Sequence, residues 1–194
     1  AAIVVHEFAH GWVADQCGDP TARQMGRLTL NPIRHVDPVG TILIPGLLLF
    51  LALQGFPAII FGWAKPVPVN FARLNHPKQD TLKVAIAGPA VNILFAMVLA
   101  VLYRLTLDPF WRPVLSAAVF VNLLLAVFNL IPIPPLDGGR VMTSLLPDDL
   151  ARRYARIERF GIVLVIALLY LGVFRRVVLP AVLGLMNVFG VAGF

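Results

Sequence analysis

The sequence predicts an all-α polytopic membrane protein with about five to six membrane segments. Hydrophobic residues make up 59% of the 194 residues and charged residues 13%, against about 25% charged in a soluble domain. The mean hydropathy is +0.84. We interpret the net charge of +6 as membrane topology and contact with anionic headgroups rather than binding of nucleic acid, because Lys and Arg lie in short loops between apolar runs.

Apolar runs predict the membrane segments in order. They cover residues 1–17, 38–63, 80–104, 113–131, 160–174 and 177–194. We expect one membrane-embedded domain over 1–194, without a signal peptide, because the chain opens inside an apolar run with no charged leader. The first run is slightly short for a bilayer, so we expect the first span to begin before Ala1.

The second run is interrupted and predicts a re-entrant segment. Pro45-Gly46 and Gly55-Phe56-Pro57 break it, and such breaks are tolerated at membrane depth only against protein or a water-filled cavity. If 38–63 returns to its own side, most of the 16 Lys and Arg residues fall on one side. The positive-inside rule makes that side cytoplasmic.

Alternating Val and Pro predict an extended segment directly after this run. Pro66 and Pro68 exclude a helix, while Val67 and Val69 favour a strand. Prolines suit an edge strand, so we expect a β-like edge near the active site that pairs with an unwound substrate. A plain connector is the alternative.

The strongest functional signal is His6-Glu7-Phe8-Ala9-His10, which lies in the first apolar run. Residues at i and i+4 share one helix face, so both imidazoles can hold one metal ion. Glu7 lies about 100° around the helix from His6, where it can act as general base. Two buried core histidines are the structural alternative, but a buried Glu between them would be costly without a task.

Further polar candidates lie later in the chain. His35 follows in the first loop, where a solvated histidine is the commoner outcome. Asn92 brings an amide into the apolar run 80–104 and is expected to face the bundle interior. Asp137 follows three prolines and precedes two glycines, which presents it on irregular backbone, although Asp137-Gly138 alone is an ordinary turn signal.

Three motifs together resemble the site-2 protease family of intramembrane zinc metalloproteases. They are the His6-to-His10 motif, Gly88-Pro89-Ala90-Val91-Asn92, and Asn129-Leu130-Ile131-Pro132 leading to Leu136-Asp137-Gly138. The resemblance implies Asp137 as third zinc ligand, Glu7 as general base, and Asn129 and Asn92 as substrate-positioning groups. With no PDZ-sized insertion between residues 105 and 112, the chain is similar to the compact branch without a PDZ domain.

These residues together predict a zinc endopeptidase with one Zn²⁺ per chain. We expect hydrolysis of a peptide bond in or near a transmembrane helix of a membrane-anchored substrate, in a bacterial or archaeal cell membrane, with the active site towards the cytoplasm. A polytopic metal transporter is the main alternative, although it would not need Glu7. A catalytically silent membrane scaffold is a third possibility, disfavoured by the intact Glu7 and Asp137.

Overall fold

The computed structural model describes residues 1–56 and 62–191 of the chain. Within these ranges every regular element is helical, which confirms the predicted all-α class. The α-helices are α1 (Ala2–Gln16), α2 (Thr21–Gln24), α3 (Ile44–Leu53), α4 (Pro77–Leu105), α5 (Trp111–Asn129), α6 (Asp137–Leu145), α7 (Asp148–Ala155), α8 (Gly161–Tyr170) and α9 (Leu179–Val188). Short helical turns of other types are η1 (Pro32–His35), η2 (Pro38–Leu43), η3 (Phe71–Arg73), η4 (Arg156–Phe160) and η5 (Phe174–Val178).

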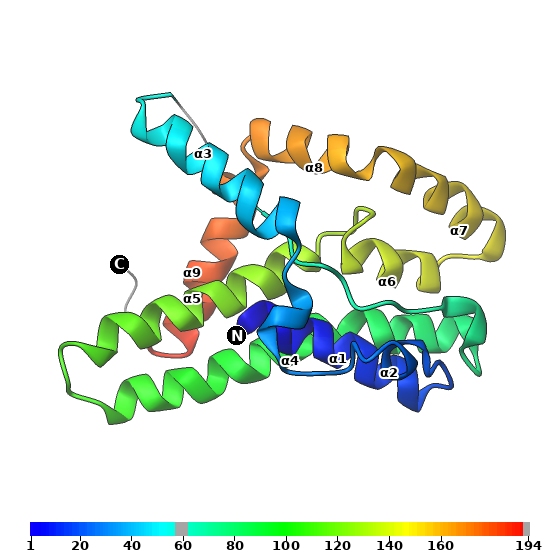
Figure 1. The fold of residues 1–194 in the computed structure, drawn as a ribbon, viewed down its shortest axis with the longest axis horizontal. Helices are drawn as coiled ribbons and strands as arrows, with labels where there is room; N and C mark the ends of the chain where they lie inside the picture. The colour runs from blue at the N-terminus through cyan, green and yellow to red at the C-terminus, as the bar shows by residue number, and fades with distance from the viewer. Residues whose placement is uncertain (57–61, 192–194) are drawn as a thin grey trace.

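Helices α4 and α5 form a long antiparallel hairpin, and α1 lies along α4 (Figure 1). Small residues on α4, Ala96 and Ala100, are buried against Val119 and Leu123 of α5, so the two backbones approach closely as in membrane helix pairs. Helix α9 closes the same cluster with Val182 and Met186. This hairpin is the framework on which α1 and α6 are held.

Among the residues that the structure describes, two helices are long and apolar enough to cross a membrane by length and composition, α4 with 29 residues and α5 with 19. A third crossing is obtained if Val163–Tyr170 and Phe174–Val188, which meet at an angle of 66°, count as one span. The predicted number of five to six segments is therefore not confirmed. The first apolar run forms α1, whose 15 residues cover about 22 Å, less than the thickness of a bilayer core.

The predicted re-entrant segment at 38–63 includes residues 57–61, which lie outside the described residues. Its described part contains η2 and then α3, whose 10 residues include no buried one. In Figure 1, α3 projects away from the α4–α5 hairpin. At Pro45 the chain passes from η2 directly into α3 without leaving the helix, so no break is found there, and the predicted break at Pro57 lies outside the described residues. The return of the segment to its own side stays a prediction.

The predicted β-like edge does not form a strand, since no residue described from 1 to 56 or from 62 to 191 is in a β-sheet. Residues 62–70 form neither helix nor strand, and they run past α1. The Val67 N–H, expected to lie on a free edge, instead donates to Glu7 Oε2 at 2.8 Å. The prolines remove two further donors, so this segment is held by side chains and by single backbone bonds from Trp63 and Lys65, and not by a ladder.

Candidate metal centre

His6 and His10 lie one turn apart on α1 and are both buried, with 6% and 9% of their surface exposed. Their rings meet edge to face with centroids 4.6 Å apart. The Nε2 atoms are 3.0 Å apart. The i, i+4 spacing therefore brings the two imidazoles to one point on the side of α1 that packs against α4.

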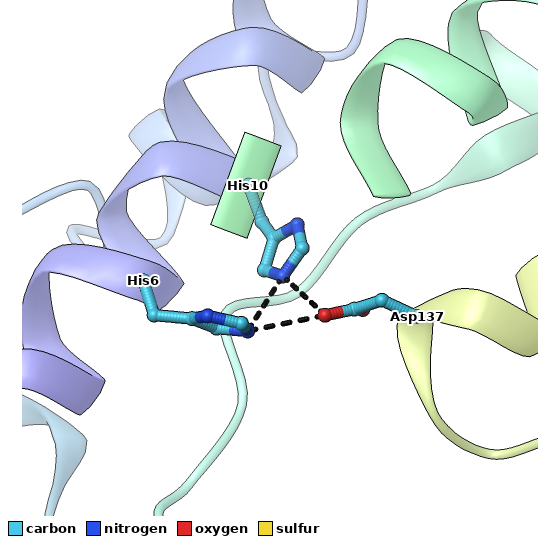
Figure 2. A group of neighbouring side chains, drawn as sticks. All are labelled: His6, His10 and Asp137. Atoms are coloured by element: carbon cyan, nitrogen blue, oxygen red, sulfur yellow. Dashed lines mark hydrogen bonds and ion pairs between the residues drawn. The ribbon is translucent and has the colours of Figure 1, made fainter. Parts of the chain in front are cut away.

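Asp137 is the first residue of α6 and reaches the same point from the other end of the chain (Figure 2). Its Oδ2 lies 3.1 Å from His6 Nε2 and 3.2 Å from His10 Nε2. Among the described residues, these three side chains form the one group of His, Cys, Asp or Glu side chains whose atoms could share a metal ion. The spacing of the two histidines predicts that they converge, and the family resemblance alone added Asp137 to them.

The turn before α6 places Asp137 by folding tightly onto the end of α5. A β-carbon at Gly138 would collide with the carbonyl oxygens of Leu130 and Ile131, so only glycine allows this approach. From α7, the Tyr154 hydroxyl donates to the Pro132 carbonyl and ties the proline-rich turn to the following helices. The prolines and glycines that break the apolar pattern thus position the carboxylate.

Glycine on α4 makes room for the histidine pair. A β-carbon at Gly88 would lie 2.6 Å from His6 Nε2 and closer still to His10 Nε2. One turn earlier, the Val84 carbonyl lies 2.7 Å from His10 Nδ1. A carbonyl can only accept, so Nδ1 carries a proton and Nε2 is left to face Asp137, the tautomer that metal ligation requires.

The three side chains fit a zinc ion. Ligand atoms about 2.0–2.1 Å from a tetrahedral zinc are about 3.3 Å apart, within a few tenths of an ångström of the observed separations. Two imidazole nitrogens and a carboxylate oxygen that face one another repel each other unless a positive charge lies between them. Without a metal ion, a second proton on an imidazole can supply this charge. Burial raises the pKa of Asp137, yet hydrogen bonds from His10 and then His6 lower it overall to about 2. A metal cation meets the same need with all three groups as ligands.

Glu7 lies beside this group and not within it. The side chain is half-buried, and its Oε2 accepts the Val67 N–H. A carboxylate has about four acceptor positions. This bond uses one of them, and Oε1 has no hydrogen-bond partner among the described residues. Sequence reasoning placed Glu7 on α1 but missed the partner, because no local pattern connects residues 60 positions apart.

The predicted asparagines differ in their surroundings. Asn92 is fully buried one turn after Gly88, and neither amide atom has a hydrogen-bond partner among the described residues. Asn129, at the end of α5, donates from Nδ2 to the Leu125 carbonyl. His35 is buried, but its Nε2 bonds the Thr29 carbonyl at 2.9 Å, and it does not join the three-residue group.

Known proteins resemble this chain over most of its length. The sequence model of "Peptidase family M50" matches residues 106–172, which include Asn129 and Asp137. "Putative zinc metalloprotease YwhC" of Bacillus subtilis (strain 168) is 38% identical over 181 residues, covering 86% of this chain and 75% of the relative. No solved structure matches the chain.

The mycobacterial proteins named "Putative zinc metalloprotease Rip2" are similar over almost the same part of the chain. The protein of Mycolicibacterium smegmatis is 31% identical and that of Mycobacterium tuberculosis (strain ATCC 25618 / H37Rv) 34% identical, over 87% and 86% of this chain. The chain spans 63% and 62% of their lengths. From the extent of the match to YwhC and the family model together, this chain belongs to Peptidase family M50, the site-2 protease family of zinc metalloproteases.

Proposed function

We propose that the chain is an intramembrane zinc endopeptidase that hydrolyses a peptide bond in or near a transmembrane helix of a membrane-anchored protein. One observation carries the proposal: His6, His10 and Asp137 converge with ligand atoms 3.0–3.2 Å apart, beside the separately held carboxylate of Glu7. Three protein ligands and a neighbouring acid are the arrangement of a catalytic zinc site.

His6, His10 and Asp137 would hold one zinc ion per chain. When bound, zinc supplies a Lewis acid that lowers the pKa of water to about 7 and polarises a carbonyl oxygen. The Val84 carbonyl holds His10 in the ligating tautomer, and packing of α4 against α1 excludes bulk water from the histidine face. These contacts fix the ligands before any substrate binds.

Glu7 would act as the general base. A base must lie within hydrogen-bond reach of the proton that it removes, and Glu7 adjoins His6 in the sequence without belonging to the ligand group. The free Oε1 would take a proton from the attacking water and return it to the leaving amine. Asn129 and Asn92 would orient the substrate through their amides, Asn92 being the one with no partner among the described residues.

The segment around Val67 and Val69 would hold the substrate in extended form. A transmembrane helix buries its carbonyls in i→i+4 bonds, so the scissile bond becomes reachable only after local unwinding. The Val67 N–H is engaged with Glu7, so added pairing would use the Val69 amide and the carbonyls beyond it. The lipid bilayer presents the substrate, and the charge distribution of the loops favours a site towards the cytoplasmic face of a bacterial or archaeal cell membrane.

A metal transporter, the alternative from a different class, has less support. Transport needs a path of ligating or carboxylate groups through the spans. Among the described residues, one group of three metal-ligating side chains is present, and the relatives carry the names of proteases. A transporter also gives no role to Glu7.

The test is cleavage of membrane-anchored peptides by the zinc-loaded protein and by Glu7→Gln. A panel of single-pass transmembrane peptides in liposomes serves as probe, because the substrate is unidentified. Wild type should cleave at least one peptide. Glu7→Gln should keep zinc, since Glu7 is not a ligand, and lose about 10²-fold or more in rate, as expected for loss of a general base. Equal cleavage by both proteins would refute the role of Glu7.

A further inference from the structure

Val67 sits over one face of α1 and makes two contacts with it. Its N–H donates to Glu7 Oε2 at 2.8 Å. Its side chain lies over Gly11, where a β-carbon would be 2.8 Å from Val67 Cγ1. Glu7 and Gly11 are four residues apart and share a helix face. Val67 therefore packs against α1 with its side chain and hydrogen-bonds the Glu7 carboxylate with its N–H.

The peptide around Val67 is held by a buried arginine. Arg27 is 8% exposed, and its Nη2 donates to the carbonyls of Lys65 at 2.9 Å and Pro66 at 3.3 Å. Among the described residues Arg27 forms no ion pair. A buried guanidinium costs free energy unless it is hydrogen-bonded. The Nε of Arg27 has no partner among the described residues, and both bonds from its Nη2 go to the two residues directly before Val67.

Two further contacts fix the same segment at its ends. The Lys65 N–H donates to the His35 carbonyl at 2.9 Å. The Asn70 N–H donates to Oδ2 of Asp19 at 2.6 Å, and Asp19 is fully buried. A segment with no ladder bonds is thus held at three points, which leaves Val67 little freedom of position.

We propose that Arg27 positions Glu7 for catalysis by clamping the Lys65–Pro66 peptide and so presenting the Val67 N–H to the Glu7 carboxylate. This inference rests on the proposed function, because it gives the general base its orientation. Glu7 is half-buried, and three side-chain torsions would otherwise let its carboxylate swing into solvent. One bond to Oε2 removes that freedom and leaves Oε1 to face water. Arg27 is a positioning residue and touches no reacting atom.

The sharpest test compares Val67→Pro with Val67→Ala in the full chain. Both remove the Val67 methyl groups that lie over Gly11, but only proline removes the N–H. Residue 67 lies in backbone that is neither helix nor strand, between two prolines. With the peptide that wild type cleaves, Val67→Pro should lower kcat at least about tenfold more than Val67→Ala, as for a misplaced base. KM and zinc per chain should be similar in the two variants.

Arg27 is tested by Arg27→Ala and Arg27→Lys, with Arg34→Ala as control, since Arg34 is an exposed arginine on the same loop. Arg27→Ala should lower kcat about tenfold with KM and zinc content retained. Arg27→Lys should recover part of kcat, because an ammonium can still donate to a carbonyl. Arg34→Ala should behave as wild type.

Amide hydrogen exchange gives a readout that does not depend on cleavage. Residues 66 and 68 are prolines, so the stretch 65–70 has few exchanging amides and the Val67 amide can be followed. Arg27→Ala and Glu7→Ala should each speed its exchange. Equal exchange in Arg27→Ala and wild type, or equal kcat for Val67→Pro and Val67→Ala, would overturn the inference. Cleavage by Glu7→Gln at the wild-type rate would instead overturn the proposed function.

Discussion

Gly88 on α4 leaves the space that the His10 imidazole occupies on α1. A β-carbon at position 88 would meet Nε2 of both His10 and His6, the atoms that face Asp137. The glycine is buried in the middle of the longest helix, where glycine costs about 0.5–1 kcal/mol relative to alanine. The cost is explained if α4 must lie close to the His6, His10 and Asp137 side chains.

Gly88→Ala should therefore lose zinc while the helix itself gains intrinsic stability. We expect at least about a tenfold weaker zinc affinity, because the methyl group must displace a ligand imidazole and misplaced ligands typically cost about 10–100-fold. Metal content by atomic absorption at limiting zinc gives the measurement.

Gly184→Ala is the matched control. Gly184 is also helical, and a β-carbon there would have no neighbouring atom within 4 Å. The variant should bind zinc as wild type does. Normal zinc binding by Gly88→Ala would mean that α4 can move away from α1.

Metal removal should lower the thermal stability of the protein. A ligand that binds only the folded state adds about 2.7 kcal/mol at a hundredfold excess over its Kd, and all three proposed ligands are drawn from packed helices. Dialysis against a chelator should lower the unfolding midpoint by several degrees in detergent, and added zinc should restore it. His10→Ala should show the lower midpoint with or without zinc. A midpoint that does not respond to the chelator in the wild type would argue against zinc in this group.

The sequence predicts the role of His10 but not that of Gly88. The i, i+4 spacing of His6 and His10 predicts their convergence from helix geometry alone, and the resemblance adds Asp137. The role of Gly88 cannot be predicted in this way, because it depends on how closely α4 approaches α1. The same holds for Arg27, which looks like an ordinary loop charge until its carbonyl partners on residues 65 and 66 are seen.

The sequence likewise predicts some elements of the fold and not others. The apolar runs at 80–104 and 113–131 predict α4 and α5 well, although Gly88 and Pro89 lie inside the first of them, since length and hydropathy decide such helices. Runs broken by Pro and Gly are ambiguous, as at 38–63, where the described part gives a short α3 without a buried residue. Strand propensity at Val67 and Val69 also failed to produce a strand. The N–H groups of Val67 and Asn70 bond to Glu7 and Asp19, and the carbonyls of residues 65 and 66 bond to Arg27.

Asn92 should be needed for activity and not for stability. It is fully buried with both amide atoms unpartnered among the described residues, and an unsatisfied buried amide costs about 1–3 kcal/mol. Asn92→Val should therefore unfold at the same or higher temperature, yet lose about tenfold in kcat/KM from one missing hydrogen bond to substrate. Asn122→Val on α5 is the control, since Asn122 is also buried but already donates to the Ala118 carbonyl. A loss of stability without loss of activity in Asn92→Val would assign Asn92 a packing role.

The segment after Trp63 should contact the substrate, and cysteine crosslinking can test this. The exposure of its residues sets the expected pattern: Val67 is 7% exposed, Val69 is half-buried and Asn70 is exposed. Because the Val67 side chain faces Gly11, cysteines at positions 69 and 70 should crosslink to a bound transmembrane peptide and one at position 67 should not.

The crosslinking variants are made in a Glu7→Gln, Cys17→Ala background, which keeps the substrate uncleaved and removes the native thiol. Leu107 provides the control position, because it is 85% exposed in the connection between α4 and α5, at the far end of the hairpin from α6 (Figure 1). Crosslinks confined to residues 160–191, with none at 69 or 70, would place the substrate on the side of α8 and α9 and contradict the proposed route to Glu7.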